Sequence, residues 1–314
     1  MVDQVIIGSR DSDLAMWQAR WVANTLQRAH PDRSFHIQGM KTKGDNILDV
    51  ALAKIGDKGL FTKELEVALL NGTIKLAVHS MKDLPTKLPE GLDIGAMCER
   101  EYPGDVLIAR DNIRLADLKI GARIGTSSLR RRAQLLNYRP DLQMVDIRGN
   151  LNTRLRKFKE LNLDAIVLAY AGIKRMGYEE MITELIPFDI CLPAVGQGSI
   201  GVEIKSTDTA TRDIIAALDH DPSRAAIEAE RAFMRRLEGG CQVPIGAYGQ
   251  IQNDILTLKG AVVDLNGQTA LRHSVTGQLA DARLLGTKLA DVLIERGAER
   301  ILRQARQEYG FHDK

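Results

Sequence analysis

Three stretches of the sequence carry side chains suited to chemistry on charged groups. The first is LEGGCQVPIG, residues 237–246, in which two glycines precede Cys241 and a proline follows it. An accessible thiolate is a nucleophile, whereas a lone buried cysteine is an inert small apolar residue. The turn residues favour an exposed loop, and none of the six histidines stands in a recognisable cysteine-hydrolase motif. The pattern indicates a thiol that holds a group rather than one that hydrolyses a bond.

The second stretch, residues 123–156, is rich in arginine: it contains eight arginines, no lysine and only two acids. Guanidinium groups bind carboxylates and phosphates through paired hydrogen bonds. GTSSLRR (125–131) and RGNLNTR (148–154) each follow an expected strand and open an expected helix, whose first N–H groups attract anions. A solvated surface is the alternative, and RNA binding is disfavoured because Tyr138 alone supplies an aromatic ring there. We expect a small polyanionic ligand.

The third stretch is VHSMKDLPT, residues 78–86, in which an apolar run ends in Ser80, Lys82 and Asp83. Open α/β sheets bind ligands at the carboxyl ends of their strands. Asp83 at such an edge is suited to donating and accepting a proton or to stabilising a cation. The alternative is that Asp83 caps the turn before Pro85.

Two glycine-rich segments have less specific patterns. LPAVGQGSIG (192–201) lacks the Gly-Lys-Ser/Thr ending of a phosphate-binding loop, and we interpret it as a hinge or as a close backbone approach to ligand. KTKGDNILDVALAKIGDKG (41–59) is either a solvated surface loop or a mobile lid that carries Lys54 and Lys58.

The elements that position these residues alternate between short β-branched runs and amphipathic helical stretches, which predicts open, mostly parallel α/β sheets. We expect a helix over about 14–29 and a second helix that Thr62 caps and Asn71-Gly72 ends. In the last third, a helix over 223–240 leads into the cysteine loop, and two strands flank Asn266-Gly267, a strong hairpin signal. We predict two α/β units followed by a smaller α+β domain.

Composition limits the possible functions further. The chain has 314 residues, enough for two or three domains, and its net charge of +2 excludes a global attraction to nucleic acid or membranes. No apolar stretch approaches the roughly 18 residues of a membrane span, and the N-terminal residues resemble no targeting sequence. The three cysteines stand far apart without CxxC spacing, so we expect no metal site and no disulfide framework. These features favour a cytoplasmic protein.

Taken together, the sequence strings resemble the porphobilinogen deaminase family, also called the hydroxymethylbilane synthases. The similarity extends from residue 8 to residue 248, and the strings occur in family order. They are GSRDSDLAMWQA, KGLFTKELEVALL, VHSMKDLPT, IGTSSLRRRAQL, RGNLNTRL, DAIVLAYAGIKRMG, LPAVGQGSIGVE and LEGGCQVPIGAY.

The resemblance implies a transferase of porphyrin and heme biosynthesis. Such an enzyme deaminates four porphobilinogen molecules, joins them head to tail on a dipyrromethane cofactor and releases the linear tetrapyrrole hydroxymethylbilane. Cys241 would hold the cofactor through a thioether, and Asp83 would carry the protons and stabilise the azafulvene cation left when ammonia departs. The acetate and propionate groups of the growing chain explain an arginine-rich cleft. We expect a monomer without nucleic-acid or membrane partners.

The resemblance also assigns further roles by motif match. Besides Cys241, the cofactor-binding positions are Lys82, Asp83, Thr126, Ser127, Ser128, Arg130, Arg131 and Arg148. The substrate-binding positions are Arg10, Ser80, Arg148, Arg154, Arg175 and Gln197. The flexible active-site loop and its edge contain Lys54, Lys58 and Phe61.

The implied fold has two domains similar to type II periplasmic binding proteins, formed by residues 1–99 with 195–217 and by residues 100–194. A third α+β domain, residues 218–314, carries the cofactor cysteine. The sequence departs from the family pattern at Ser9, where threonine is usual, at Arg132, which extends an arginine pair, and at 102–105, which reads Tyr-Pro-Gly-Asp instead of Asp-Pro-Arg-Asp. We expect the last change to affect the hinge between the first two domains.

Two other classes of protein fit parts of this pattern. A non-catalytic protein of the same bilobal fold would bind an organic anion, but the chain shows neither a signal peptide nor a helix-turn-helix signature. A cysteine hydrolase would need a histidine motif that the sequence does not contain.

Overall fold

The computed structural model describes residues 4–42, 44, 59–237 and 243–308. The described residues form two compact units, of which unit 1 contains residues 4–42, 44, 59–101 and 198–224. Unit 2 contains residues 102–197, 225–237 and 243–308. Each unit has hydrophobic cores of its own. The division into three domains stays a prediction.

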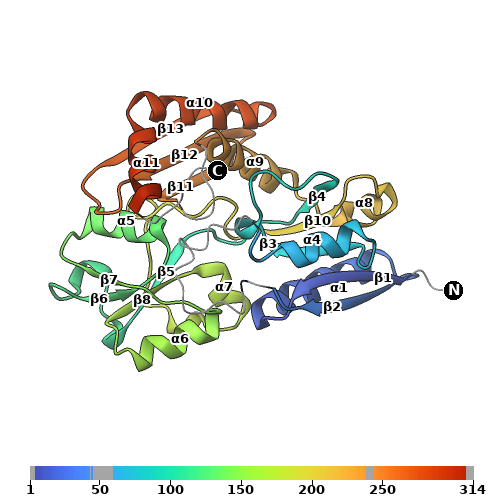
Figure 1. Cartoon of the computed structure of the whole chain (residues 1–314), viewed down its shortest axis with the longest axis horizontal. Coiled ribbons are helices and arrows are strands. Elements are labelled where there is room, and N and C mark those ends of the chain that lie inside the picture. Colours follow the sequence, from blue (N-terminus) through green and yellow to red (C-terminus); the bar gives the residue numbers. More distant parts are fainter. Residues whose placement is uncertain (1–3, 43, 45–58, 238–242, 309–314) are drawn as a thin grey trace. The chain divides into compact units, whose positions relative to one another are not determined.

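Unit 1 is built on a five-stranded sheet of order β2-β1-β3-β10-β4 (Figure 1). The strands are β1 (Gln4–Arg10), β2 (Ser34–Met40), β3 (Leu76–Ser80), β4 (Leu92–Met97) and β10 (Ile200–Lys205). β1 pairs in parallel with β2 and β3, whereas β10 is antiparallel to both β3 and β4. Four strands therefore run in one direction, and the strand from the 195–217 segment runs in the other.

Different helices cover the two faces of this sheet. Leu76 and Val78 share a core with residues of α1 (Asp13–Ala29), whereas Ala77 packs with residues of α4 (Lys63–Leu70). This split follows from the period of two along a strand, which turns alternate side chains to opposite faces. A shorter helix, α8 (Thr209–Ile215), follows β10. The predicted helices near 14–29 and after Thr62 are confirmed.

Unit 2 contains a second five-stranded sheet, of order β7-β6-β8-β5-β9. Its strands are β5 (Asp105–Ala109), β6 (Arg123–Gly125), β7 (Gln143–Val145), β8 (Ala165–Ala169) and β9 (Glu184–Leu185). β6 pairs in parallel with β7 and β8, and β5 is antiparallel to β8 and β9. The two sheets share one pattern of strand directions. The helices α5 (Leu129–Tyr138), α6 (Leu151–Glu160) and α7 (Tyr170–Arg175) each follow one of its strands.

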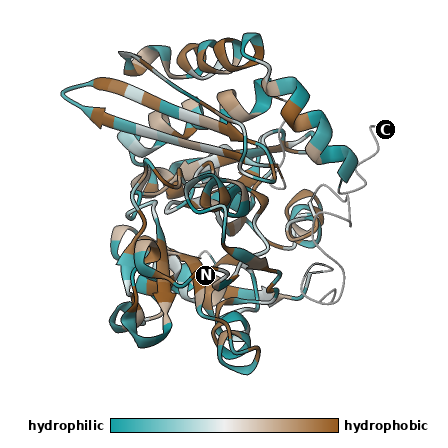
Figure 2. Cartoon of the chain, turned by 90° about the vertical axis from the view of Figure 1, so that its left-hand side faces the viewer, coloured by the Kyte–Doolittle hydropathy of each residue, from teal (hydrophilic) through white to brown (hydrophobic). Residues whose placement is uncertain are grey.

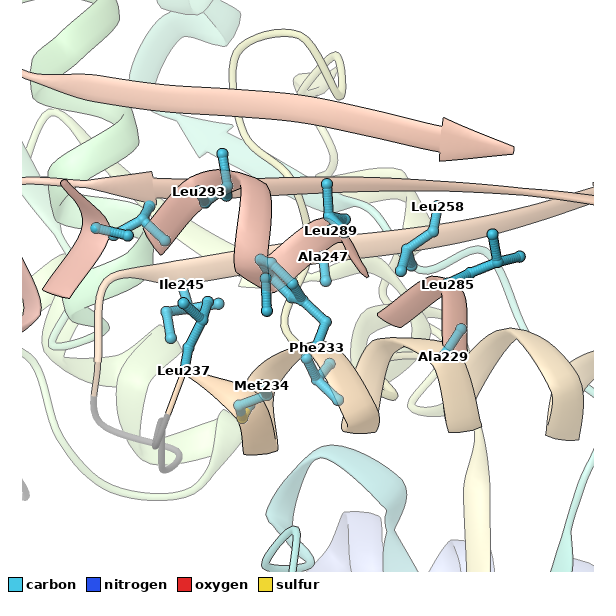
Figure 3. Close-up of a cluster of buried hydrophobic side chains, with 14 of the residues drawn as sticks. Ala229, Phe233, Met234, Leu237, Ile245, Ala247, Leu258, Leu285, Leu289 and Leu293 are labelled. Atoms are coloured by element: carbon cyan, nitrogen blue, oxygen red, sulfur yellow. The ribbon is translucent and has the colours of Figure 1, made fainter. Parts of the chain in front are cut away.

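The C-terminal part of unit 2 is a three-stranded antiparallel sheet with helices packed on it. Its elements are β11 (Ile245–Gln252), β12 (Ile255–Val263), β13 (Ala270–Gln278), α9 (Asp221–Arg236), α10 (Ala282–Glu295) and α11 (Ala298–Glu308). Figure 3 shows Phe233 of α9 and Leu289 of α10 among the apolar side chains of this core. The hairpin predicted at Asn266-Gly267 is confirmed, and Gly267 takes a φ of 72° at its turn.

The predicted fold class, two α/β sheets followed by an α+β part, is confirmed. The prediction of mostly parallel sheets holds for four of the five strands in each large sheet. Figure 2 shows apolar and polar residues interleaved along the helices and strands, as expected for elements with one buried side.

Candidate active site

The predicted site residues fall in both units, and three of them lie outside the described residues. Those three are Lys54, Lys58 and Cys241. Unit 1 contributes Arg10, Phe61, Ser80, Lys82 and Asp83. Unit 2 contributes Thr126, Ser127, Ser128, Arg130, Arg131, Arg148, Arg154, Arg175 and Gln197.

In unit 1, β3 ends at Ser80 and the chain turns at once into a short 3₁₀ helix, Met81–Asp83, called here the β3 turn. Two buried apolar side chains, Met81 and Leu84, hold this turn against the sheet. The backbone N–H of Met81 donates to the carbonyl of Ser199 at 3.0 Å. Lys82 and Asp83, which lie between those anchors, are half-buried. The fold thus keeps a carboxyl group accessible on a turn whose backbone is fixed.

Polar neighbours complete this edge of unit 1. The Gln18 amide donates to the Ser80 hydroxyl at 2.9 Å. Arg10 ends β1, and its guanidinium lies 4.4 Å from the centre of the Phe61 ring. Because β1 and β3 are parallel neighbours, their carboxyl ends lie at the same edge of the sheet. The structure therefore brings Arg10 and Phe61 into contact, at the sheet edge where β3 ends.

In unit 2, two helix N-termini lie side by side. Ser128 caps α5 by accepting from the Arg131 N–H at 3.4 Å, and Asn150 caps α6 by accepting from the Thr153 N–H at 2.9 Å. The Ser127 hydroxyl joins the two segments, since it donates to the Ile147 carbonyl at 3.0 Å and accepts from the Ile147 N–H at 2.8 Å. The strand–turn–helix pattern predicted for both segments is confirmed. Thr126 is buried beneath them.

Arg130 and Arg131 bind a carboxylate of the protein itself. Arg130 donates to Asp105 Oδ2 at 2.7 Å, and Arg131 donates to Asp105 Oδ1 at 2.8 Å. The Gln197 amide also donates to Asp105 Oδ1, at 2.8 Å, and to the Pro103 carbonyl at 2.6 Å. Asp105 is fully buried, and the other three side chains are nearly so. We call this group the Asp105 cluster.

Electrostatics within the Asp105 cluster follow from burial and pairing. Burial alone would raise the pKa of Asp105, but the two guanidiniums hold it far below its usual range. The buried Cys191 thiol lies 3.5 Å from Asp105 Oδ2, and burial raises the pKa of Cys191 to about 12. Cys191 is therefore an unreactive thiol at neutral pH. Two guanidiniums and one carboxylate leave the cluster with one net positive charge.

Three further predicted site arginines lie in unit 2. Arg148 lies just before Gly149, whose φ of 117° few other residues adopt. Arg154, in the first turn of α6, donates from Nε to the Gly149 carbonyl at 2.8 Å. Arg175 is the last residue of α7. All three side chains are half-buried.

The sequence analysis noted residues 102–105 only as a departure from the family pattern and predicted no role for Asp105 or for the ring stack beside it. Tyr102 stacks on Phe188 with ring centres 5.5 Å apart, and Phe188 contacts Tyr248 at 4.5 Å. Gly104 allows this arrangement, because a Cβ there would lie 2.4 Å from the Tyr102 ring. The available signal for Asp105 was an acidic residue at the start of the apolar strand DVLIA, since a buried acid needs a cationic partner.

The glycine-rich segment 192–201 crosses from unit 2 to unit 1 after Gln197. Gly196 and Gly198 both have positive φ, and a Cβ on Gly198 would lie 2.3 Å from the Glu101 carbonyl oxygen. The second glycine is therefore required by a close backbone approach within unit 1. The hinge stays a prediction.

Comparisons with known proteins give matches over nearly the whole chain. Residues 5–213 match the family "Porphobilinogen deaminase, dipyromethane cofactor binding domain", and residues 225–295 match "Porphobilinogen deaminase, C-terminal domain". The chain is 58% identical over 308 residues to the porphobilinogen deaminase of Carboxydothermus hydrogenoformans, covering 98% of this chain and 99% of that protein. It is 60% identical over 308 residues to that of Pelotomaculum thermopropionicum, with the same coverage.

Among solved structures, the chain is similar to the VFT2 domain of Bordetella pertussis BvgS, with a TM-score of 0.42 and 16% identity. That match covers 69% of this chain and 86% of the domain. Within the described residues, no helix is long and apolar enough to cross a membrane. The same residues contain no group of His, Cys, Asp and Glu that would hold a metal ion.

Proposed function

The chain belongs to the porphobilinogen deaminase family, and we propose which of its residues carry out that family's reaction. The activity is that of a hydroxymethylbilane synthase, a transferase of tetrapyrrole and heme biosynthesis. Four porphobilinogen molecules lose ammonia and are joined head to tail on a dipyrromethane primer. When bound, the primer supplies the terminal pyrrole carbon to which the first unit is joined.

The residues of unit 2 fit a dipyrromethane that carries carboxylates. The paired N-termini of α5 and α6 direct backbone N–H groups toward one region, which favours anions. The Asp105 cluster adds one net positive charge. Arg131 Nε is buried and has no hydrogen-bond partner among the described residues, so it remains a donor for an acidic group. We propose that Arg130 and Arg131 hold cofactor carboxylates while Asp105 and Gln197 orient the two guanidinium groups.

Further positions complete the proposed binding site. In unit 2, the hydroxyls of Thr126, Ser127 and Ser128 shape the α5 end of the site, and Arg148 lies at the adjoining turn. Arg154 and Arg175 would bind the carboxylates of added substrate units, as Arg10 would in unit 1. Lys82 would contact the cofactor, Ser80 the substrate, and Phe61 would form the edge of a loop that carries Lys54 and Lys58.

Asp83 is the proposed proton carrier, and its place on the β3 turn is the observation that carries the mechanism. Met81 and Leu84 fix the turn, so the half-buried carboxyl group can approach a reacting nitrogen without moving the backbone. Asp83 would protonate the departing amine of porphobilinogen and stabilise the cation left on that substrate. The same carboxylate would then accept the proton lost when the new bond forms.

We propose that Cys241 attaches the dipyrromethane through a thioether. Intact-mass spectrometry of the denatured protein should show an adduct of two pyrrole units, and Cys241→Ser should lose it. Cys98→Ser is the matched control, because Cys98 is buried in the core of unit 1 and should leave the adduct unchanged. An active wild-type enzyme without any adduct would overturn the assignment.

A second test addresses Asp83. Asp83→Asn keeps the shape of the side chain but cannot carry a proton, so turnover should fall by about 100-fold or more while porphobilinogen still binds. Substrate capture by rapid mixing, followed by mass spectrometry of the protein, separates binding from turnover. Wild-type turnover in this variant would remove Asp83 from the mechanism.

The family also supports three further proposals. We propose that the enzyme is a cytoplasmic monomer. We also propose three domains: residues 1–99 with 195–217, residues 100–194 and residues 218–314. Size-exclusion chromatography with light scattering tests the monomer, and limited proteolysis tests the domain boundaries.

A further inference from the structure

A group of buried polar side chains lies on the α4 side of the unit 1 sheet, directly before the β3 turn. His79 Nε2 lies 3.1 Å from Glu203 Oε2, and both side chains are almost fully buried. Glu66 of α4 is also buried and interacts electrostatically with both of them. Glu203 Oε1 has no hydrogen-bond partner among the described residues. We call these three side chains the His79 cluster.

Apolar residues would serve the stability of the sheet better at these positions. The neighbouring residues of the two strands, Ala77 and Val202, are apolar and buried. Replacing both partners of a buried hydrogen-bonded pair with apolar groups of similar shape can be nearly neutral or stabilising. The His79 cluster therefore calls for a role other than packing.

The position of Glu203 on β10 suggests that role, because β10 contacts the β3 turn at alternate residues. Ser199 accepts the Met81 N–H at 3.0 Å. Two residues on, a Cβ at Gly201 would lie 2.8 Å from Met81 Sδ and 3.1 Å from Leu84, so the turn packs directly on the glycine. Two residues further, Glu203 binds His79. Ser199, which directly precedes β10, and Gly201 thus contact the β3 turn, and Glu203 on the same strand binds His79 just before the turn.

Glu66 connects the His79 cluster to the segment that carries Phe61. The Thr62 hydroxyl donates to Glu66 Oε1 at 2.6 Å instead of capping α4. Gly59 packs beside them, since a Cβ there would lie 3.2 Å from the Thr62 hydroxyl and 3.8 Å from Glu66 Oε2. Phe61 lies between these residues in the sequence and stacks under Arg10. The His79 cluster therefore adjoins both groups of predicted site residues in unit 1: those of the β3 turn, and Phe61 with Arg10.

We propose that Glu203, acting through His79, is a positioning residue that fixes the β3 turn and thereby the direction of the Asp83 carboxyl group. The inference rests on the proposed role of Asp83. The hydrogen bond holds the His79 side chain, and His79 directly precedes Ser80, where the chain leaves the strand. When this bond is lost, the carboxyl group samples more directions, so the rate of proton transfer falls while substrate binding persists.

The first test is Glu203→Met, which keeps nearly the length of the side chain and removes the partner of the His79 hydrogen bond. The variant should carry the two-pyrrole adduct, lose about tenfold in kcat and change KM by less than about twofold. A second variant, His79→Leu with Glu203→Leu, guards against misfolding, because an apolar pair should be at least as stable as the wild type. It should be slow as well, and full activity in either variant would overturn the proposal.

A double-mutant cycle with Asp83→Asn separates positioning from a general structural effect. If Glu203 acts only through Asp83, then Glu203→Met should cause no further loss of kcat in the Asp83→Asn background. A second tenfold loss there would show that Glu203 acts elsewhere. Asp208→Ala is the control, since it removes a cap of α8 in the same unit and should leave kcat unchanged. A fully active Asp83→Asn enzyme would instead overturn the proposed function itself.

Discussion

Asp105→Asn should destabilise the protein more than any other single loss of a carboxylate in the arginine-rich sheet. The wild-type carboxylate is fully buried and accepts from Arg130 at 2.7 Å, Arg131 at 2.8 Å and Gln197 at 2.8 Å. An asparagine of the same size keeps at most part of these hydrogen bonds and leaves two buried guanidiniums without a counter-ion.

The size of the effect follows from the geometry. Removing one partner of a buried ion pair costs about 3–5 kcal/mol, because the other charge stays buried and uncompensated. Each kcal/mol lowers the melting temperature of a domain of 150–250 residues by about 2–4 °C, so the midpoint should fall by about 6–20 °C. The low pKa of Asp105 stabilises the fold at all pH values above the usual aspartate range. This contribution is lost as the pH falls through the folded-state pKa, so variant and wild type should converge only in strong acid.

Differential scanning calorimetry of both proteins in the Cys241→Ser background gives the comparison free of any difference in adduct occupancy. Glu160→Gln is the matched control: its carboxylate pairs with Arg156 at 3.5 Å, but both side chains are exposed, and an exposed ion pair contributes little. A midpoint for Asp105→Asn within about 2 °C of its parent would refute the reasoning, because it would mean that the two guanidiniums need no buried counter-ion.

Two further predictions follow from the raised pKa values of buried side chains. Burial raises the pKa of Glu66 above 4.5, and the nearby Glu203 adds to the rise. A raised folded-state pKa contributes stability that is present at low pH and lost as the pH rises. The free energy of unfolding of Glu66→Gln in urea titrations should therefore increase relative to that of the wild type between about pH 5 and about pH 8. An equal difference between the two proteins at both pH values would contradict this. Because burial raises the pKa of Cys191 to about 12, iodoacetamide at neutral pH should label Cys191 in the denatured protein but not in the folded one, as peptide mass spectrometry can check.

Local signals in the sequence predict the elements of this fold well, because their causes are local. Ser128 and Asn150 stand at helix starts and accept from N–H groups three residues ahead, as their types and positions predict. The Asn266-Gly267 pair predicts its hairpin for the same reason. β11 was not predicted: its Gly249 is typical of a turn, yet the glycine is required by a helix, since a Cβ there would lie 3.0 Å from Ala226.

The contacts of the candidate site were harder to predict, because they join residues far apart in the sequence. The sequence indicates that Arg130 and Arg131 bind carboxylates, but not that Asp105, 25 residues earlier, binds both. Glu203 and His79 are separated by 124 positions and meet only because β10 inserts beside β3. Nothing local in either strand specifies that pairing. For Cys241, local chemistry indicated a thiol that holds a group and left an inert thiol as the alternative, and only the family resemblance named the group.

The Asp105 cluster also bears on how a site for carboxylates can be built from buried arginines. Two adjacent guanidiniums repel each other, and without a counter-ion they would lose their hydration at a large cost in free energy. One carboxylate bound to both removes the repulsion and fixes their planes, yet it cancels only one of the two charges. The remaining positive charge is held in place before any ligand arrives, so little side-chain entropy is lost on binding. An acidic residue in place of Gln197 would cancel that charge. The Gln197 amide instead supplies the third hydrogen bond to Asp105 and leaves the charge intact.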